Sequence, residues 1–337
     1  MARLAPYLSQ HQSLNGPGDN RPTAAQIIED QGLVGKWSGR VVLVTGCSPG
    51  GLGPEAARAF HLAGADVYIT VRDAVNGNQV TKDILSDGRP GKVEVIQMDL
   101  ASIDSIKAGA EEFLSKSKKL NVLLNNAGLM ACPQGKTKDG FELQFGTCHL
   151  GHFLLFQLLK STLLTSSTPE FNSRVVSVSS AAHRDGQINL DDLNWEKVEY
   201  NAWAAYGQAK LANIHFANEL DRRYGKLGLH SWSLHPGGIF TPLQKYIPNA
   251  EEVMQHPSVK KMLKSPAQGA ATSVWTAMAK ELEGTGGRYM EDVAESEPVV
   301  GEVVVGGPGY APQAYDPPTE KALWAASLKM LNLEDDE

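Results

Sequence analysis

The stretch VVLVTGCSPGGLG, from Val41 to Gly53, places four aliphatic residues directly before a glycine-rich turn. Four of the eight residues from Gly46 to Gly53 are glycine, and PEAARAFHLAGA, residues 54–65, follows with a helical pattern. Glycine allows positive φ angles and lets backbone N–H groups approach a ligand closely, while a helix N-terminus carries partial positive charge. The stretch therefore predicts a strand, a phosphate-binding turn and a helix.

Two kinds of phosphate-binding turn need to be distinguished. The loop of nucleoside triphosphatases ends in Gly-Lys-Ser/Thr, whereas Gly53 is followed by Pro54 and Glu55. Pro54 suits the first position of a helix. A second apolar run, DVYITVR at residues 66–72, follows the helix, as in a dinucleotide-binding unit of strand, helix and strand. We therefore interpret the turn as a dinucleotide site.

Six short apolar runs alternate with longer amphipathic segments along the chain. They are RVVLVTG (40–46), DVYITVR (66–72), VEVIQMDL (93–100), NVLLNNAG (121–128), SRVVSVSS (173–180) and LHSWSLHPG (229–237). Near-continuous apolar runs are typical of strands buried on both faces, and their alternation with helices indicates parallel strands joined by right-handed crossovers. We therefore expect an α/β fold with one doubly wound parallel sheet, a Rossmann fold, in a single domain.

The composition bounds this domain. The chain has 337 residues, of which 42% are hydrophobic and 20% charged, and this suits one large α/β domain, which we place at residues 39–330. Residues 1–38 are rich in Gln, Asn, Gly and Pro with one helical pattern, and we expect a loosely attached arm with a short helix. We expect residues 331–337 to form a frayed tail.

Charge and cysteine content exclude several classes of function. A net charge of −7 argues against a nucleic-acid footprint, which needs clustered Lys and Arg. Cys47, Cys132 and Cys148 form no CxxC pair, and no His lies at metal-ligand spacing, so we expect no metal and a reducing compartment. No apolar run reaches the length of a bilayer, and no signal segment is evident. We therefore expect a cytoplasmic protein without a membrane span.

Further motifs follow the glycine turn in a fixed order. NNAG ends at Gly128, VSVSS ends at Ser180, and YGQAK places Tyr206 and Lys210 on one helical face at i, i+4 spacing. HPGGIFT follows at residues 235–241. With these motifs the chain resembles the short-chain dehydrogenase/reductase family over residues 39–330. MACPQGKTKDGFELQFGTCHLGHF and YGQAKLAN make it similar to the retinol-dehydrogenase-like branch.

The resemblance implies a catalytic role for three residues. Ser180 would bind the substrate oxygen, Tyr206 would be the general acid or base, and Lys210 would hold the ribose hydroxyls and favour the phenolate. An unperturbed Tyr titrates near pH 10, so it needs help to act at neutrality. An ammonium group at about 4 Å contributes about 1 to 4 kcal/mol toward the phenolate. The hydride would come from a nicotinamide.

The identity of the nicotinamide cofactor depends on the end of the second strand. Arg72 lies 19 residues beyond Gly53, where an acidic partner of an NAD ribose would stand, and it suits a 2′-phosphate instead. We therefore expect NADP(H) over NAD(H), although the adjacent Asp73 offers an alternative contact to the ribose. The further cofactor contacts expected from the resemblance are Gly46, Ser48, Gly51, Leu52, Gly53, Asp99, Leu100, Asn126, Ala127, Gly128, Tyr206, Lys210, Pro236, Gly237, Ile239 and Thr241.

Two features depart from the family pattern. The turn TGCSPGGLG contains one residue more than TGxxxGxG, so either Gly50 or Gly51 takes the middle role. Cys148 stands where the family has a catalytic Asn, and a thiol cannot reproduce the hydrogen bonds of an amide. The water relay beyond Lys210 is therefore in question.

The substrate is indicated by two segments. Tyr206 lies 26 residues after Ser180, about twice the usual family spacing, and the insertion at residues 185–203 carries Trp195, Tyr200 and Trp203. A lid segment is expected at about residues 240–265. Both segments suit a pocket for a bulky lipophilic carbonyl or alcohol, and both are equally consistent with packed surface insertions.

Alternatives remain open at this point. An NADP-binding regulatory protein that has lost efficient turnover would explain Cys148, and an epimerase or dehydratase on the same scaffold would need sugar-nucleotide recognition that we do not find. His149, His152 and His183 suggest either a base or metal site or packing positions, and we favour packing. A homodimer is also left open. The leading interpretation is an NADP(H)-dependent carbonyl reductase or alcohol dehydrogenase.

Overall fold

The computed structural model describes residues 3–301 and 307–335. Its centre is one eight-stranded sheet with the strand order β3-β2-β1-β4-β5-β6-β7-β8. The strands are β1 (Val41–Val44), β2 (Asp66–Val71), β3 (Val93–Gln97), β4 (Val122–Asn125), β5 (Ser173–Val178), β6 (Leu229–His235), β7 (Arg288–Glu291) and β8 (Ala294–Glu295). All neighbours pair in parallel except β7 and β8. The predicted doubly wound α/β fold is confirmed.

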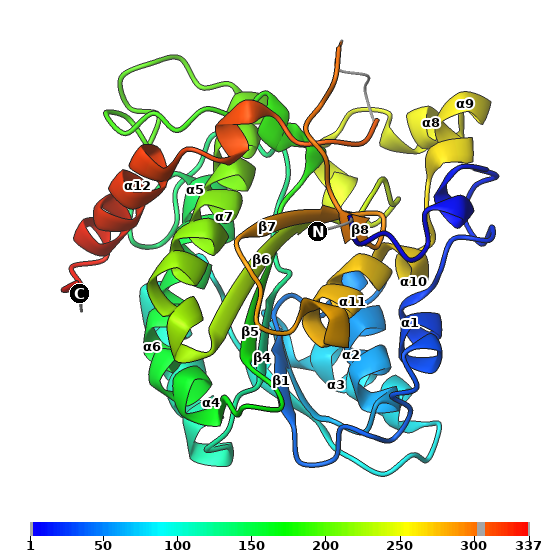
Figure 1. Ribbon diagram of the computed structural model, residues 1–337. Helices are drawn as coiled ribbons and strands as arrows, with labels where there is room; N and C mark the ends of the chain where they lie inside the picture. Colours follow the sequence, from blue (N-terminus) through cyan, green and yellow to red (C-terminus); the bar gives the residue numbers. More distant parts are fainter. Residues whose placement is uncertain (1–2, 302–306, 336–337) are drawn as a thin grey trace.

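Helices cover both faces of this sheet (Figure 1). They are α1 (Ala24–Asp30), α2 (Leu52–Leu62), α3 (Ala74–Leu85), α4 (Ile103–Lys116), α5 (Leu143–Phe145), α6 (Gly151–Ser166), α7 (Ala202–Tyr224), α8 (Ala250–Gln255), α9 (Pro257–Met262), α10 (Pro266–Gly269), α11 (Ala271–Met278) and α12 (Pro317–Met330). Helices α1, α2, α3 and α11 pack on one face, and α4, α6, α7 and α12 pack on the other. The sheet is therefore the middle of three layers.

Strand β1 shows how the sequence builds these layers. Successive side chains of a strand point to opposite faces. Val42 and Val44 enter the core beneath α2, whereas Val41 and Leu43 enter the core beneath α4 and α6. All four side chains are at most 5% exposed, which explains why the strand is uniformly apolar rather than alternating.

All six strands predicted from apolar runs are present, whereas β7 and β8 were not predicted. They contain only four and two residues. The turn between them places Asp292 and Val293 at φ angles of 52° and 57°. Because glycine, Asn or Asp usually occupies both such positions, a valine in the second gives no turn signal in the sequence.

The N-terminal arm is not loosely attached, contrary to expectation. Thr23 caps α1 by accepting a hydrogen bond from the Gln26 backbone, and Ile28 of α1 is fully buried. Trp37 is 4% exposed and packs edge-on against Phe171, with ring centroids 5.1 Å apart. The polar composition hid these anchors, because a few apolar side chains are enough to fix a segment on an existing core.

The tail is partly anchored, and its last two residues lie outside the described range. Leu331 is 9% exposed, and Asp335 forms an ion pair with Arg223 at 2.8 Å. The expected fraying at residues 331–337 therefore does not begin at 331. The boundaries of the 39–330 domain stay a prediction.

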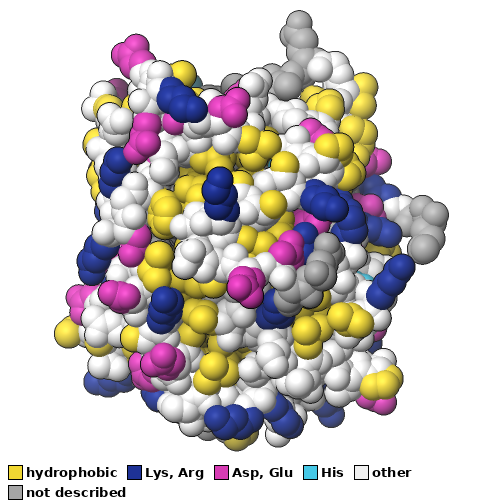
Figure 2. All heavy atoms as spheres, turned by 90° about the vertical axis from the view of Figure 1, so that its left-hand side faces the viewer, with side chains coloured by type: hydrophobic (Ala, Val, Ile, Leu, Met, Phe, Trp, Pro, Cys, Tyr) yellow, Lys and Arg dark blue, Asp and Glu magenta, His cyan; other side chains and the backbone are white. Residues whose placement is uncertain are grey.

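The face formed by α4, α6 and α12 carries charges of both signs interspersed with apolar side chains (Figure 2). No large patch of one sign is visible on it. Among the described residues, no helix combines the length and apolar character needed to cross a membrane.

Candidate active site

The predicted glycine turn lies where the strand order changes direction, between β1 and β4. Ligands of open α/β sheets bind at the carboxyl ends of the strands at this point. Gly46 has a φ of 73°, and a Cβ there would lie 2.6 Å from the Ala127 Cα. A Cβ on Gly53 would lie 2.7 Å from the Gly46 carbonyl oxygen. Neither position has space for a side chain, so the two turns approach each other closely.

The extra residue of the turn is accommodated by two different conformations. Gly50 has a φ of 76°, a region that L-residues rarely adopt. Gly51 is extended, with φ −91°, and forms the N-cap of α2. Leu52 begins the helix, and Ser48 is exposed beside the turn. The conformational demand for glycine therefore falls on Gly50, while Gly51 opens the helix.

The NNAG turn is tied to the glycine turn by hydrogen bonds. Asn126 Nδ2 donates to the Thr45 carbonyl at 2.8 Å, and Thr45 Oγ1 accepts from the backbone N–H groups of Asn126 and Ala127, both at 3.0 Å. Thr45 Oγ1 also lies 2.8 Å from His152 Nε2, and His152 Nδ1 lies 2.9 Å from the Cys148 carbonyl. The network joins two expected cofactor-binding turns to the helix that carries Cys148.

The side chains of Arg72 and Asp73 differ in the hydrogen bonds that they form. Asp73 is the N-cap of α3, where its Oδ1 accepts from the Val75 backbone at 2.9 Å and its Oδ2 accepts from Asn76 Nδ2 at 3.2 Å. The Arg72 side chain is exposed, and only its carbonyl is bonded, by Gln97 Nε2 at 2.9 Å. The guanidinium is therefore the more available of the two charges at the end of β2.

Two of the expected cofactor contacts, Asp99 and Leu100, follow the end of β3. Leu100 is 6% exposed, and Asp99 Oδ1 accepts a hydrogen bond from the Ala101 backbone at 3.0 Å. Their place beside Arg72 follows from the parallel pairing of β2 with β3, which sets Val71 opposite Gln97.

The structure brings Ser180, Tyr206 and Lys210 together. Ser180 follows β5 and caps a short 3-10 helix at Ala181–Arg184, with its hydroxyl accepting from the Ala182 backbone at 3.2 Å. Tyr206 and Lys210 lie on α7 and are 3% and 4% exposed. The Lys210 ammonium lies 5.6 Å from the centre of the Tyr206 ring.

Opposing effects act on the Tyr206 hydroxyl. Burial raises its pKa, whereas the Lys210 charge and a hydrogen bond from Ser180 lower it. The pKa stays above its usual value because burial outweighs the other two contributions. Lys210 therefore acts in the expected direction, and Tyr206 holds its proton at neutral pH.

Cys148 lies in the same cluster. It belongs to a π-helical turn at Gly146–Leu150, a feature that often marks functional sites. Its Sγ is 3.6 Å from the Leu129 carbonyl oxygen. A Cβ built on Gly128 would lie 3.5 Å from Cys148 Sγ and 3.4 Å from Lys210 Nζ. The thiol and the Lys210 ammonium therefore both lie beside Gly128, and the ammonium donates to the Val178 carbonyl at 3.1 Å.

The aromatic side chains of the insertion at residues 185–203 have two different environments: two are packed and one is exposed. Tyr200 accepts a hydrogen bond from Gln144 Nε2 at 2.8 Å and packs edge-on against Trp195, with centroids 5.8 Å apart. Trp203 is 54% exposed, and its ring lies 6.2 Å from that of Tyr206. Trp195 and Tyr200 therefore serve packing, and Trp203 borders the candidate site.

The segment at residues 236–241 is held by the lid segment, residues 240–265. Gly237 has a φ of 104°, and a Cβ there would lie 2.9 Å from Lys264 Cδ. Ile239, which is 6% exposed, pairs with Lys264 as a parallel bridge. Thr241 caps a 3-10 helix at Pro242–Tyr246. The expected contacts Pro236, Gly237, Ile239 and Thr241 therefore lie on one loop.

Sequence reasoning missed Arg184, which follows His183 behind Ser180. His183 Nδ1 lies 2.6 Å from the Ser180 carbonyl, and Arg184 donates to the carbonyls of Gly309 at 2.9 Å and Gly307 at 2.5 Å. Every residue has a backbone carbonyl, so the sequence does not show which residues a guanidinium will contact when its partners are carbonyls. Arg184 thereby attaches a distant loop to the turn that carries Ser180.

The histidines considered earlier are buried. Burial lowers the pKa of His149 to about 3 and those of His152 and His183 to about 4, so all three are neutral at pH 7. His149 lies among aromatic rings, with the Phe145 centroid 5.0 Å away. In the part of the chain that the structure describes, no group of three or more His, Cys, Asp or Glu could hold a metal ion.

Known proteins are similar to this chain in sequence and fold. The family model described as short chain dehydrogenase matches residues 40–252. Short-chain dehydrogenase/reductase prx1 of Penicillium roqueforti is 50% identical over 334 residues, covering 98% of this chain and 96% of its own. Retinol dehydrogenase 12 of Mus musculus is 37% identical over 298 residues, covering 88% and 87%. The crystal structure of an uncharacterised protein from Mycobacterium paratuberculosis aligns with a TM-score of 0.66 at 33% identity, covering 88% of this chain and 95% of that one.

Proposed function

Because the chain belongs to the short-chain dehydrogenase/reductase family and is an oxidoreductase similar to the retinol dehydrogenases, we propose that it interconverts a bulky lipophilic carbonyl and its alcohol with NADP(H). One observation carries this proposal. Ser180, Tyr206 and Lys210 lie together at the carboxyl edge of the sheet, the edge at which the glycine turn also lies.

Each of these three groups has a distinct task in the proposed reaction. A bound nicotinamide cofactor would supply or accept the hydride. Ser180 donates a hydrogen bond to the substrate oxygen, and Tyr206 gives that oxygen its proton during reduction. A phenol that keeps its proton at neutral pH suits this direction. Lys210 makes the proton transfer easier, because its charge stabilises the phenolate that remains.

The chain offers a cradle that fits a dinucleotide. Side chains are excluded at Gly46 and Gly53, so backbone N–H groups can approach a pyrophosphate closely. Helix α2 starts at Leu52 and directs its N-terminus to the turn. NADP(H) is favoured over NAD(H) because the exposed Arg72 is available to a 2′-phosphate, while Asp73 is engaged in capping α3.

Exposed apolar side chains beside Tyr206 and on the lid segment support a lipophilic substrate. Trp203 is 54% exposed next to Tyr206, and Phe240, Tyr246 and Met262 of the lid segment are 44%, 40% and 41% exposed. When a ligand covers large exposed apolar side chains, their removal from water makes binding more favourable. A homodimer and a cytoplasmic location are kept as predictions.

A second candidate is an NADP-binding protein with little turnover. Cys148 supports it, because its buried thiol replaces an amide beside Lys210. The two candidates differ in what they predict for a replacement of Tyr206. The replacement should lower the turnover of a catalyst, whereas it should have little effect on a protein that only binds the cofactor.

The test is oxidation of NADPH by a panel of lipophilic aldehydes and ketones, followed at the absorbance of the reduced nicotinamide. Tyr206→Phe removes the transferable proton and should lower turnover by about 100-fold to 10,000-fold. NADPH affinity should persist. Tyr68→Phe is the matched control, since Tyr68 lies on β2 against Phe113 of α4, with ring centroids 5.0 Å apart, and this variant should keep wild-type turnover. Near-normal turnover of Tyr206→Phe would contradict the proposed role.

A further inference from the structure

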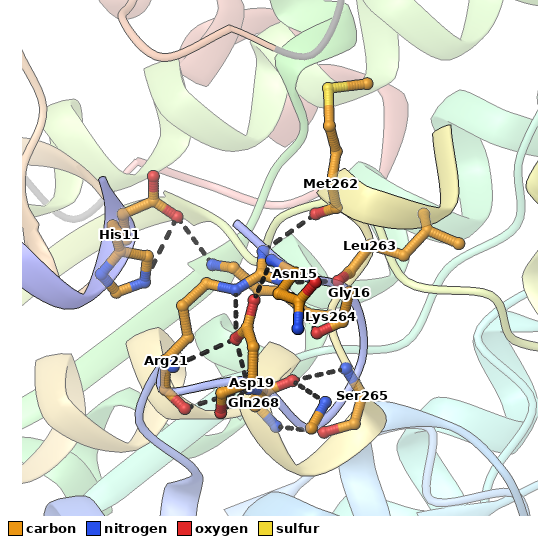
Figure 3. A network of polar contacts seen from close by, with 12 residues as sticks. His11, Asn15, Gly16, Asp19, Arg21, Met262, Leu263, Lys264, Ser265 and Gln268 are labelled. Carbon is orange, nitrogen blue, oxygen red and sulfur yellow. Dashed lines mark hydrogen bonds and ion pairs between the residues drawn. The ribbon is translucent and has the colours of Figure 1, made fainter. Parts of the chain in front are cut away.

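The N-terminal arm crosses the end of the lid segment, where Arg21 and Asp19 form a buried ion pair (Figure 3). Arg21 is 3% exposed, and its Nε donates to Asp19 Oδ1 at 2.8 Å. The guanidinium also donates from Nη1 to the Met262 carbonyl at 2.9 Å and from Nη2 to the Leu263 carbonyl at 2.5 Å. These carbonyls belong to the end of α9. The arm therefore binds the C-terminal end of the lid segment with charge-assisted hydrogen bonds.

Gln268 of α10 completes the same network. Its Oε1 accepts from the backbone N–H groups of Gly18 and Ser265, both at 2.9 Å. Its Nε2 donates to Asp19 Oδ1 and to the Arg21 carbonyl, both at 3.0 Å. The side chain is 1% exposed. One amide thus joins the arm to Ser265, the last residue of the lid segment.

Lys264 continues the connection from the lid to the loop at residues 236–241. Its backbone N–H donates to the Gly238 carbonyl at 2.8 Å, and its Nζ donates to the Pro236 carbonyl at 3.3 Å and to Asp292 Oδ1 at 2.7 Å. Lys264 is 4% exposed. Lys264, which lies between Leu263 and Ser265 of the arm network, therefore holds the loop that carries four of the expected cofactor contacts.

The lid segment has little packing of its own. Helices α8 and α9 contain six residues each, and neither buries any residue. Helices this short are not stable by themselves in water. The position of the lid therefore depends on its two ends, and the arm network holds one of them.

From these contacts we infer that Arg21 is a positioning residue for the reaction, which the N-terminal arm uses to hold the lid segment and the loop at residues 236–241 in their working arrangement. The inference rests on the proposed function, because it takes this loop as part of the nicotinamide site. Without Arg21, the lid would occupy the working arrangement for a smaller fraction of the time, and the apparent KM would rise in inverse proportion.

The kinetic test compares Arg21→Met with Arg58→Met. Methionine fills much of the volume of the arginine stem without its donors. Because Arg21→Met removes charge-assisted hydrogen bonds to two lid carbonyls, it should raise the KM for the carbonyl substrate by about 10-fold or more. The kcat should change by less than about 3-fold, because saturating substrate selects the working arrangement. Arg58 pairs with Asp83 on an exposed surface, and its replacement should alter neither constant.

Hydrogen exchange followed by mass spectrometry supplies a readout that needs no turnover. Arg21→Met should accelerate amide exchange in peptides covering residues 236–265 and leave residues 41–128 unchanged. If this variant does not fold, Asp19→Asn weakens the same network more gently and should shift KM and exchange in the same direction.

Two results would overturn the inference: an unchanged KM in a folded variant, or exchange accelerated equally in residues 41–128, which would show a merely structural role. If the wild-type protein reduces no carbonyl of the panel, the proposed function fails, and exchange alone then decides whether Arg21 holds the lid.

Discussion

The two halves of the sheet build the candidate site in different ways. In the nucleotide half, β1–β4, turns approach each other so closely that Gly46 and Gly53 have no space for a Cβ. In the substrate half, β5–β8, backbone carbonyls of the connecting segments accept hydrogen bonds from Arg21 and Arg184, two side chains that lie far from these carbonyls in the sequence. A requirement for glycine leaves a mark in the sequence. A contact to a carbonyl leaves none on the receiving residue, since every residue has one.

The first prediction concerns Arg72, the one long side chain that we expect to matter in the nucleotide half. Because a charge-assisted contact contributes about 1.5 to 3 kcal/mol, Arg72→Ala should weaken NADPH by about 10-fold to 150-fold. Binding of NADH should change much less. Titration of both cofactors checks this, with Arg58→Ala as a surface control. Equal losses would show that Arg72 does not bind the 2′-phosphate, and the cofactor would then be held by the turns alone.

The second prediction concerns the stability of the protein in acid and depends on His149, which lies in the sequence between β4 and β5. His149 is buried with a pKa of about 3, so below the unfolded value of about 6.5 the unfolded chain binds a proton that the folded chain does not. Stability is therefore complete above pH 6.5 and falls as the pH falls toward 3. At pH 5.5 this one residue costs about 1.4 kcal/mol.

His149→Phe removes this titration and keeps an aromatic ring beside Phe145. The loss of unfolding free energy between pH 7.5 and pH 5.5 should therefore shrink by about 1.4 kcal/mol in urea titrations. His256→Gln is the control, because His256 is exposed on the lid segment. An unchanged pH dependence in His149→Phe would mean that His149 is accessible to protons in the folded chain.

The smallest effect is expected at Cys148, where the family pattern breaks. Ser180 and Tyr206 set the geometry of the reaction, and solvent can replace a proton relay beyond Lys210. Cys148→Asn should therefore change turnover by less than about 10-fold, equivalent to about 1.4 kcal/mol in the barrier. A thermal melt must accompany the kinetics, because a buried amide without partners lowers stability. A gain of orders of magnitude in a folded variant would favour the cofactor-binding alternative.

The role of Ser180 beside Tyr206 and Lys210 was implied by the resemblance to the family. The sequence itself predicted the six parallel strands from their apolar runs and, from i, i+4 spacing, placed Tyr206 and Lys210 on one helical face. It did not predict β7 and β8, which are too short to show a period. The packing of the arm was also missed, because Arg21 contacts carbonyls more than 240 positions away along the chain. Such contacts depend on the tertiary fold, and the arm's polar composition gave the opposite impression.

The most direct test of the proposed carbonyl reduction follows the transfer of one deuterium atom from the cofactor to the substrate. NADPH carrying deuterium at the transferable position of its nicotinamide is incubated with the protein and a lipophilic aldehyde, and the alcohol is analysed by mass spectrometry. The proposed function predicts that the alcohol gains one deuterium with the wild-type protein and that its rate of formation falls by about 100-fold or more with Tyr206→Phe. If no carbonyl of the panel acquires deuterium although NADPH binds, the chain is a cofactor-binding protein and not the reductase proposed here.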